Sequence, residues 1–194
     1  MKNEQPDARV AIVRGTVERA CLAPENVFGY SIWTHHIVWV ERYGLELAQV
    51  LGANPLTVQL AALLHDYAGI KAAALAPAHH LYGVEETARV LGELGYPADL
   101  IRAVQHCVLT HRASQSLKPE TLEAVCLASA DAMAHIAQVP SLLHLAYARR
   151  GLGVDAGVLW VRGKLERSYR KLCPEAQEMI GARYEGALEL LTTA

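Results

Sequence analysis

Two adjacent residues, His65 and Asp66, have the types and the setting of metal ligands. They follow an apolar run at residues 61–64, whose composition indicates a buried helix. Neighbouring residues on an α-helix point about 100° apart, so both side chains can face one ion only where the helix ends. An isolated pair of this kind is more often a buried histidine beside a capping aspartate. The pair therefore indicates chemistry only if further ligands exist elsewhere in the chain.

Further side chains of the ligand type lie on both sides of that pair in the sequence. His35 and His36 belong to the preceding helical segment, and Asp131 follows an apolar stretch at residues 125–130. Burying a carboxylate in such a stretch is costly unless a cation or a hydrogen-bond donor compensates it. A divalent metal would supply that compensation, and imidazoles mixed with carboxylates suit Fe, Mn, Zn or Mg. The residue types therefore favour a divalent metal site.

The composition supports histidine rather than cysteine as the source of ligands. The chain has nine histidines and one phenylalanine. Its four cysteines are scattered without a C-x-x-C motif, which favours buried, reduced thiols. Eighteen basic against twenty acidic residues give a formal net charge of −2, so a long nucleic acid is not an expected partner. No stretch reaches the roughly 18 apolar residues of a membrane span, so no membrane association and a cytoplasmic location are expected.

The elements that carry these residues are all predicted to be helices. Apolar residues recur at helical spacing and never alternate over a useful length, so the predicted fold class is all-α. The 194 residues are expected to form one compact multi-helix bundle. Residues 68–77 are predicted to form a loop with at most a short helix. The predicted helices span residues 8–21, 30–51, 55–66, 79–94, 97–111, 119–137 and 142–149, and two more lie between 155 and 194.

Helix geometry leaves open how His36 and His65 would meet. Gly52 and the Asn54-Pro55 pair indicate a left-handed helix cap followed by a new helix start, so the two histidines lie on consecutive helices. At about 1.5 Å per residue, straight helices place His36 about 24 Å from the connecting turn but His65 only about 15 Å from it. Either the His-Asp pair lies beyond the end of its helix, or the helices cross obliquely, or the first helix is shorter than predicted.

In the order of these residues, the chain resembles the HD-domain metal-dependent phosphohydrolases. That family has an early histidine, a His-Asp pair and a later aspartate in an all-helical fold. The segments similar to these motifs are residues 36–40, 63–67 and 130–132, and further similarity lies at 79–83, 108–112 and 119–124.

The resemblance covers roughly residues 30–135, and the region from 160 to 191 is similar to the helical extension of some small bacterial members. It implies a single HD-like domain over residues 1–194. The core of this domain would span about 28–137, and a C-terminal helical extension would span about 153–194.

The resemblance also implies the ligands of one or two divalent ions. Members with additional histidines bind a second ion that the aspartate of the His-Asp pair bridges, and His80 and His111 are similar to those histidines. His106 lies about 140° from His111 around a regular helix, so the two should not bind the same ion, and the resemblance favours His111. Asp66 would also be the catalytic residue that positions the attacking hydroxide. The first ion would be held by His36, His65, Asp66 and Asp131.

The residues expected to bind phosphate depart from the family pattern. Many members carry Gly-Lys just after the His-Asp pair, whereas here Lys71 comes two residues late. Lys71 would either reach the phosphate from a longer loop or be an ordinary solvated lysine. Arg112 is the second expected substrate-binding residue, because a guanidinium can bind phosphate oxygens in a bidentate manner. The alternative is that the Arg112 side chain faces solvent.

The function implied by the resemblance is hydrolysis of a phosphate ester or anhydride of a small molecule such as a nucleotide, with a metal-bound water as nucleophile. The chain lacks the G-x-x-x-x-G-K-[ST] motif of P-loop NTPases and the G-x-S-x-G motif of α/β-hydrolases. Two alternatives stay open. One is a di-iron HD-type oxygenase with the same ligands, and the other is a non-catalytic nucleotide-sensing HD module.

Apolar side chains also recur at near-helical intervals in the C-terminal tail. They would pack either on the core of the same chain, which is the commoner outcome, or on a second subunit in a homodimer. These side chains are Trp160, Leu165, Leu172, Ile180 and Leu188.

Overall fold

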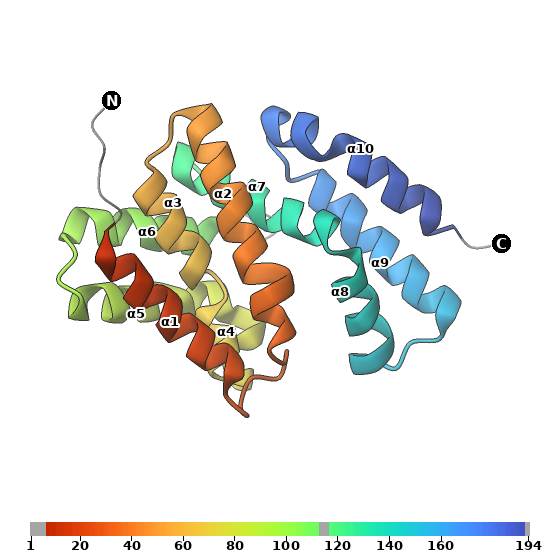
Figure 1. Cartoon of the computed structure of the whole chain (residues 1–194), viewed down its shortest axis with the longest axis horizontal. Helices are drawn as coiled ribbons and strands as arrows, with labels where there is room; N and C mark the ends of the chain where they lie inside the picture. The colour runs from red at the N-terminus through yellow and green to blue at the C-terminus, as the bar shows by residue number, and fades with distance from the viewer. Residues whose placement is uncertain (1–6, 113–116, 193–194) are drawn as a thin grey trace.

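The computed structural model describes residues 7–112 and 117–192, and within these ranges the chain is helical without a β-strand (Figure 1). The predicted all-α fold class is therefore confirmed. The α-helices are α1 (Ala8–Leu22), α2 (Val38–Leu51), α3 (Pro55–Leu64), α4 (Tyr67–Lys71), α5 (His79–Glu93), α6 (Ala98–Thr110), α7 (Leu122–Ala137), α8 (Val139–His144), α9 (Val154–Tyr169) and α10 (Pro174–Leu190). Trp33–Ile37 and Leu145–Arg149 form π-helical turns, and Ala73–Ala78 forms a 3₁₀ helix. None of the helices in the described ranges is long and apolar enough to cross a lipid bilayer.

Helix α7 is the central helix of the bundle. It contacts α2, α3 and α6 in the N-terminal part of the chain and α9 and α10 in the C-terminal part (Figure 1). Residues 124–136 of this helix are almost all buried, as expected for a helix that is apolar on every side. Asp131 is therefore carried into the interior, where its charge needs compensation.

The C-terminal tail packs on the rest of the same chain. Leu165 of α9, Ile180 of α10 and Leu172 between them are buried in the hydrophobic core, and Trp160 and Leu188 are partly buried against it. Helices α9 and α10 lie side by side along one end of the molecule (Figure 1). Packing on the core is thus the alternative that the structure shows for these apolar side chains.

The connection between α2 and α3 follows the predicted capping pattern. Gly52 has a φ of 69°, which favours glycine because other residues are strained in the left-handed region. Asn54 caps α3, because its side chain accepts a hydrogen bond from the Thr57 N–H at 3.0 Å, and Pro55 is the first residue of the helix. This tight connection places α2 and α3 against each other, with His36 and His65 at their far ends.

Gly83 allows α5 to approach α6 closely, and its substitution is expected to be destabilising. A Cβ at this position would lie 2.7 Å from Val108 Cγ1, which is closer than packed carbon atoms approach. Gly83→Ala should therefore lower the free energy of unfolding by roughly 1–3 kcal/mol, measured by urea denaturation. Gly92 is the matched control, because it lies in the same helix and an added Cβ would have nothing within 4 Å. Gly92→Ala should raise the stability by up to about 1 kcal/mol, and equal effects of both substitutions would contradict the close packing.

Candidate metal centre

The residues of the candidate site meet where their helices begin or end. Helix α3 ends at Leu64, so His65 and Asp66 lie in the turn between α3 and α4. His36 lies in the π-helical turn that precedes α2, a kind of wide turn that is frequent at functional sites. Of the three ways to bring His36 to His65, the structure therefore shows the His-Asp pair beyond the end of its helix.

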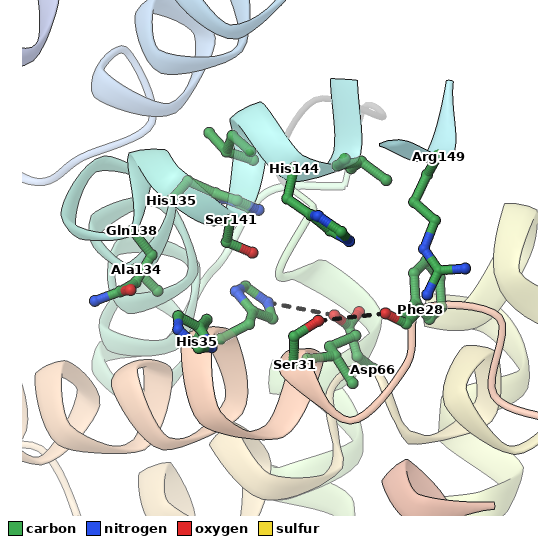
Figure 2. Close-up of a pocket in the computed structure, with 14 residues that line it drawn as sticks. Phe28, Ser31, His35, Asp66, Ala134, His135, Gln138, Ser141, His144 and Arg149 are labelled. Carbon is green, nitrogen blue, oxygen red and sulfur yellow. Dashed lines mark hydrogen bonds and ion pairs between the residues drawn. The ribbon is translucent and has the colours of Figure 1, made fainter. Parts of the chain in front are cut away.

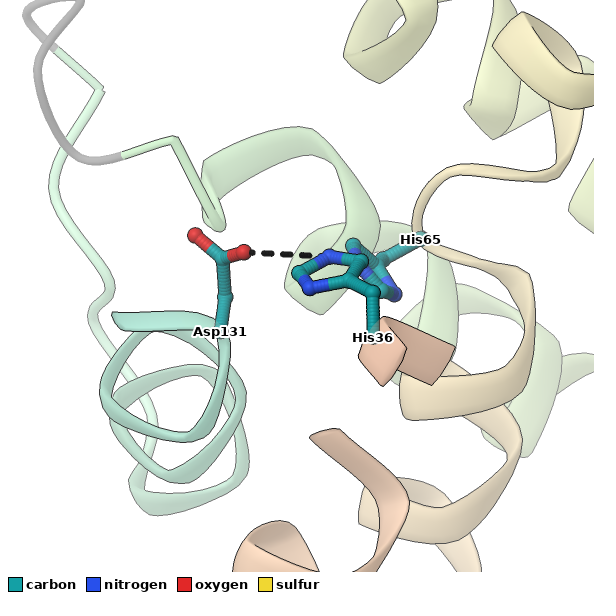
Figure 3. Close-up of side chains that lie close together, drawn as sticks. All are labelled: His36, His65 and Asp131. Carbon is teal, nitrogen blue, oxygen red and sulfur yellow. Dashed lines mark hydrogen bonds and ion pairs between the residues drawn. The ribbon is translucent and has the colours of Figure 1, made fainter. Parts of the chain in front are cut away.

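The first ligand group consists of His36, His65 and Asp131 (Figure 3). His36 Nε2 lies 3.2 Å from His65 Nε2 and 3.5 Å from Asp131 Oδ1. One potential ligand atom from each of the three residues lies within 4.8 Å of the others. His65 is fully buried, and Asp131 is 6% exposed. This spacing allows a single ion to contact all three side chains.

The second ligand group consists of Asp66, His79 and His111. Asp66 Oδ1 lies 3.0 Å from His79 Nε2 and 4.0 Å from His111 Nε2. The other carboxylate oxygen, Asp66 Oδ2, lies 3.3 Å from His36 Nε2 and 3.4 Å from His65 Nε2. Asp66 therefore faces both ligand groups, one with each oxygen.

Three of these histidines are oriented in the same way. The Nδ1 atoms of His65, His79 and His111 lie 2.8, 2.8 and 2.6 Å from the carbonyl oxygen three residues earlier in the chain. An Nδ1–H donates to each carbonyl, so in the neutral ring Nε2 keeps its lone pair. All three Nε2 atoms point to Asp66. This is the orientation that metal-ligating histidines show in proteins.

The facing nitrogen atoms need a cation between them. His36 Nε2 and His65 Nε2 are 3.2 Å apart, and His79 Nε2 and His111 Nε2 are 3.1 Å apart, with the Asp66 carboxylate next to both pairs. Lone pairs at these distances repel each other and the carboxylate unless a proton or a metal ion lies between them. The donor set of imidazole nitrogen and carboxylate oxygen fits a divalent metal.

Burial and charge act in opposite directions on the titratable groups of the site. Burial opposes ionisation of Asp131, but the neighbouring side chains of His135 and Lys171 hold the pKa of this carboxyl well below its ordinary value. Asp66 is partly buried, which opposes its ionisation, but its histidine neighbours, led by His65, hold its pKa well below the ordinary value.

Burial disfavours the imidazolium form of His111 and lowers its pKa to about 3. Burial opposes protonation of His65 and His79 as well, but Asp66 raises the pKa of His65 to about 9 and raises that of His79. A metal ion would therefore replace the proton on these two rings, whereas the carboxylates and His111 are already in the form that metal binding requires.

His135 adds an unsatisfied polar atom to the first ligand group. Its Nδ1 is buried and has no hydrogen-bond partner among the described residues, and it lies 3.6 Å from Asp131 Oδ1. Its ring also lies next to that of His36, with 4.9 Å between the ring centroids. A buried polar atom without a partner is costly, which again fits a bound group at this position.

His79, and not the predicted His80, lies in the second ligand group. His80 Nδ1 lies instead 3.4 Å from Arg112 Nη1. Because α5 begins at His79 and successive side chains point about 100° apart, only one of the two histidines can face Asp66. The sequence contains no signal that separates them, since the rotation of α5 is set by its packing on α6 and α4.

The two predicted phosphate-binding residues have different positions. Lys71 ends α4 and donates to Glu86 Oε1 at 2.7 Å, and its side chain is 44% exposed and lines neither of the cavities at the site. The predicted substrate-binding role of Lys71 is therefore not supported by its position. Arg112 does line the larger cavity beside His111, and its guanidinium donates to the Pro77 carbonyl at 2.8 Å.

The larger cavity has a volume of about 380 Å³ and extends from the two ligand groups to the C-terminal helices. Lys164 of α9 and Lys171, just beyond the end of α9, line it. Lys171 Nζ lies 4.0 Å from Asp131 Oδ2, and burial lowers the pKa of Lys164. Sequence reasoning missed both lysines, because the charged run at residues 162–171 does not show which of its members face the site. The basic side chains that line this cavity are Arg112, Arg150, Lys164 and Lys171.

A smaller cavity of about 160 Å³ adjoins the same ligands and shares His36, Asp66 and His135 with the larger one. Figure 2 shows Ser141 and His144 on one side of it, across from Asp66. Polar groups and an apolar wall thus lie within reach of the metal ligands. The apolar part of the wall includes Phe28, Ile32, Leu142 and Leu145.

Comparison with known proteins gives one family match and one structural match. The family model described as HD domain matches residues 33–135. The crystal structure of Bacillus subtilis YpgQ in complex with ADP is similar with a TM-score of 0.68 and 18% sequence identity, over 94% of this chain and 93% of that chain. At this identity the likeness shows a shared fold. No curated protein matches the sequence.

Proposed function

The chain belongs to the HD-domain family, and on this basis we propose that it is a metal-dependent hydrolase of phosphate ester or anhydride bonds. Its substrate would be a small molecule, with nucleotides as the favoured class. The proposal assigns the metal-ligand role to His36, His65, Asp66 and Asp131 for one ion, and to Asp66, His79 and His111 for a second.

The observation that carries this proposal is the convergence of four Nε2 atoms on one carboxylate. The nitrogens of His36, His65 and His79 lie 3.0–3.4 Å from Asp66 oxygens, and that of His111 lies at 4.0 Å. Such a set serves no purpose in packing, because buried polar atoms without a shared cation are destabilising. A divalent metal is the group that satisfies all of them at once.

The chemistry divides between the bound ions and the side chains around them. When bound, divalent ions lower the pKa of water and offset the charge on phosphoryl oxygens. Asp66 is ionised and faces both ligand groups, so it would accept a hydrogen bond from the attacking water and orient it. Arg112 would bind a phosphoryl oxygen from the wall of the larger cavity.

The cavities support a substrate with a charged and a less polar part. The basic side chains of the larger cavity suit phosphate, and the apolar side chains of Phe28, Leu142 and Leu145, which line both cavities, suit an organic group. That YpgQ was crystallised with ADP, on a fold shared over nearly its whole length, supports a nucleotide.

Metal removal tests the proposal directly. We expect the protein as purified to contain Fe, Mn, Zn or Mg by elemental analysis, and to release phosphate or pyrophosphate from members of a panel of nucleotides and simple phosphate esters. Incubation with a chelator should abolish this release, and addition of Mn²⁺ or Mg²⁺ should restore it, because the bound ion is what would activate the attacking water.

Other results would overturn the proposal in distinguishable ways. Tightly bound mixed-valence iron with O₂ consumption and without phosphate release would indicate an oxygenase. Nucleotide binding without metal and without turnover would indicate a sensing module.

A further inference from the structure

We infer that Lys164 and Lys171 form an anion site for the additional phosphate groups of a substrate with two or more linked phosphates. The inference rests on the proposed function, because it assigns a substrate class to the same site. Both lysines belong to the C-terminal helical region, outside the segment at residues 33–135 that matches the family model.

The two lysines are placed to act on one ligand. They are seven residues apart, which is about two helical turns, so they lie on the same face of α9 and its continuation. Both line the larger cavity together with His36 and Asp66. Any anion that reaches the metal ligands from this side therefore meets both ammonium groups.

Asp131 links the lysines to the first ligand group. Its Oδ1 faces His36 Nε2 at 3.5 Å, while its Oδ2 lies 4.0 Å from Lys171 Nζ. At 4.0 Å, Lys171 is too far to be engaged in a hydrogen bond with the carboxylate, so its N–H groups stay available to another acceptor. A phosphate that bridges from the first ligand group to Lys171 would use this space.

Lys164 has no ion-pair partner within 4.0 Å among the described residues, although it is partly buried. Arg162 in the same helix differs in this respect, because its Nε pairs with Glu166 Oε1 at 3.3 Å. A partly buried ammonium group without a counter-charge is costly. An anionic ligand in the cavity would provide a partner in direct contact.

The charges around the larger cavity favour more than one phosphate. Arg112, Arg150, Lys164 and Lys171 line it, against the carboxylates of Asp66 and Asp131. Divalent ions would already compensate these two carboxylates and the reacting phosphate, which leaves the four basic side chains in excess.

The basic groups also flank the ligands at two ends. Arg112 lies beside His111 of the second group, and Lys171 lies beside Asp131 of the first. A chain of linked phosphates would offer separate oxygen acceptors to the basic groups at the two ends.

Calorimetric titration of the metal-loaded protein with pyrophosphate and with orthophosphate tests the inference. We expect pyrophosphate to bind at least about tenfold more tightly than orthophosphate, since it gains charge-assisted hydrogen bonds. Lys164→Met and Lys171→Met should each lose about tenfold in pyrophosphate affinity, while orthophosphate affinity changes less than threefold. Lys164→Arg, which keeps the charge, should retain most of the pyrophosphate affinity. Lys71→Met is the matched control and should leave both affinities unchanged, because Lys71 lies outside the cavities.

Metal content, measured on each variant, separates anion binding from a role in holding the ions. Unchanged metal content with weaker pyrophosphate binding supports the inference. Equal affinities for the two anions in the unmodified protein, or loss of metal from Lys164→Met, would overturn it. If hydrolysis is absent but pyrophosphate binding still depends on Lys164, the proposed function fails and the anion site stands. If hydrolysis occurs and both anions bind alike, the anion site fails alone.

Discussion

Asp66→Asn is expected to lower kcat/KM for phosphate release by roughly a thousandfold or more, which corresponds to about 4 kcal/mol of transition-state stabilisation. The substitution keeps the shape of the side chain but removes the negative charge that faces both ligand groups. Asp66 has a histidine nitrogen within 3.4 Å of each of its two oxygens. An uncharged amide in this place cannot serve both ligand groups, because an NH₂ group replaces one carboxylate oxygen and can only donate hydrogen bonds. The measurement is steady-state kinetics together with metal content by elemental analysis.

Asp99→Asn is the matched control for this substitution. The Asp99 side chain is 90% exposed on α6 and pairs only with Arg102 in the described part of the chain, so its removal should change kcat/KM by less than twofold. Full metal content and full activity in Asp66→Asn would be incompatible with the site described above.

His79→Ala should remove the second metal ion and reduce kcat/KM by at least about a hundredfold. Replacing a residue that only hydrogen-bonds to a metal ligand lowers metal affinity or activity by up to about a hundredfold, and His79 would be a ligand itself. His79 Nε2 lies 3.0 Å from Asp66 Oδ1. Elemental analysis should show one metal equivalent less than in the unmodified protein, and circular dichroism should show unchanged helicity.

The adjacent residue provides the control for that experiment. His80→Ala should keep both metal equivalents, since the His80 ring lies against Arg112 rather than against Asp66. The opposite pattern, with metal lost from His80→Ala and kept in His79→Ala, would restore His80 as the ligand.

The sequence predicted the fold because its signals are local. Apolar spacing, Gly52 and the Asn54-Pro55 start depend on residues close together in the chain, and the structure shows the helix cap and the helix start at these positions. Helix α7 begins at Leu122 rather than near residue 119, because Thr121 caps it by accepting a hydrogen bond from Ala124 N–H.

The candidate site could be predicted only in part, because side-chain direction depends on helix rotation. A shift of one residue in the start of α5 exchanges His79 for His80, and such a shift leaves no trace in the spacing of apolar residues. Lys71 comes close in sequence to the His-Asp pair, yet the short helix α4 directs it to Glu86. Lys164 is 33 residues from Asp131, and only the packing of α9 on α7 brings the two elements together.

The π-helical turn at Trp33–Ile37 separates the direction of the His36 side chain from the packing of the apolar residues that follow it. A regular helix would fix the two together. In an ordinary α-helix, the side chains that pack inward fix the direction in which every other side chain points. Here the i→i+5 hydrogen bonding of the π-helical turn before Val38 changes the direction of the His36 side chain around the helix axis relative to the buried residues Val40 and Leu47. The apolar residues of α2 can therefore keep their packing on α7 while the direction of the His36 imidazole is set separately. Substitutions among these apolar residues need not change that direction.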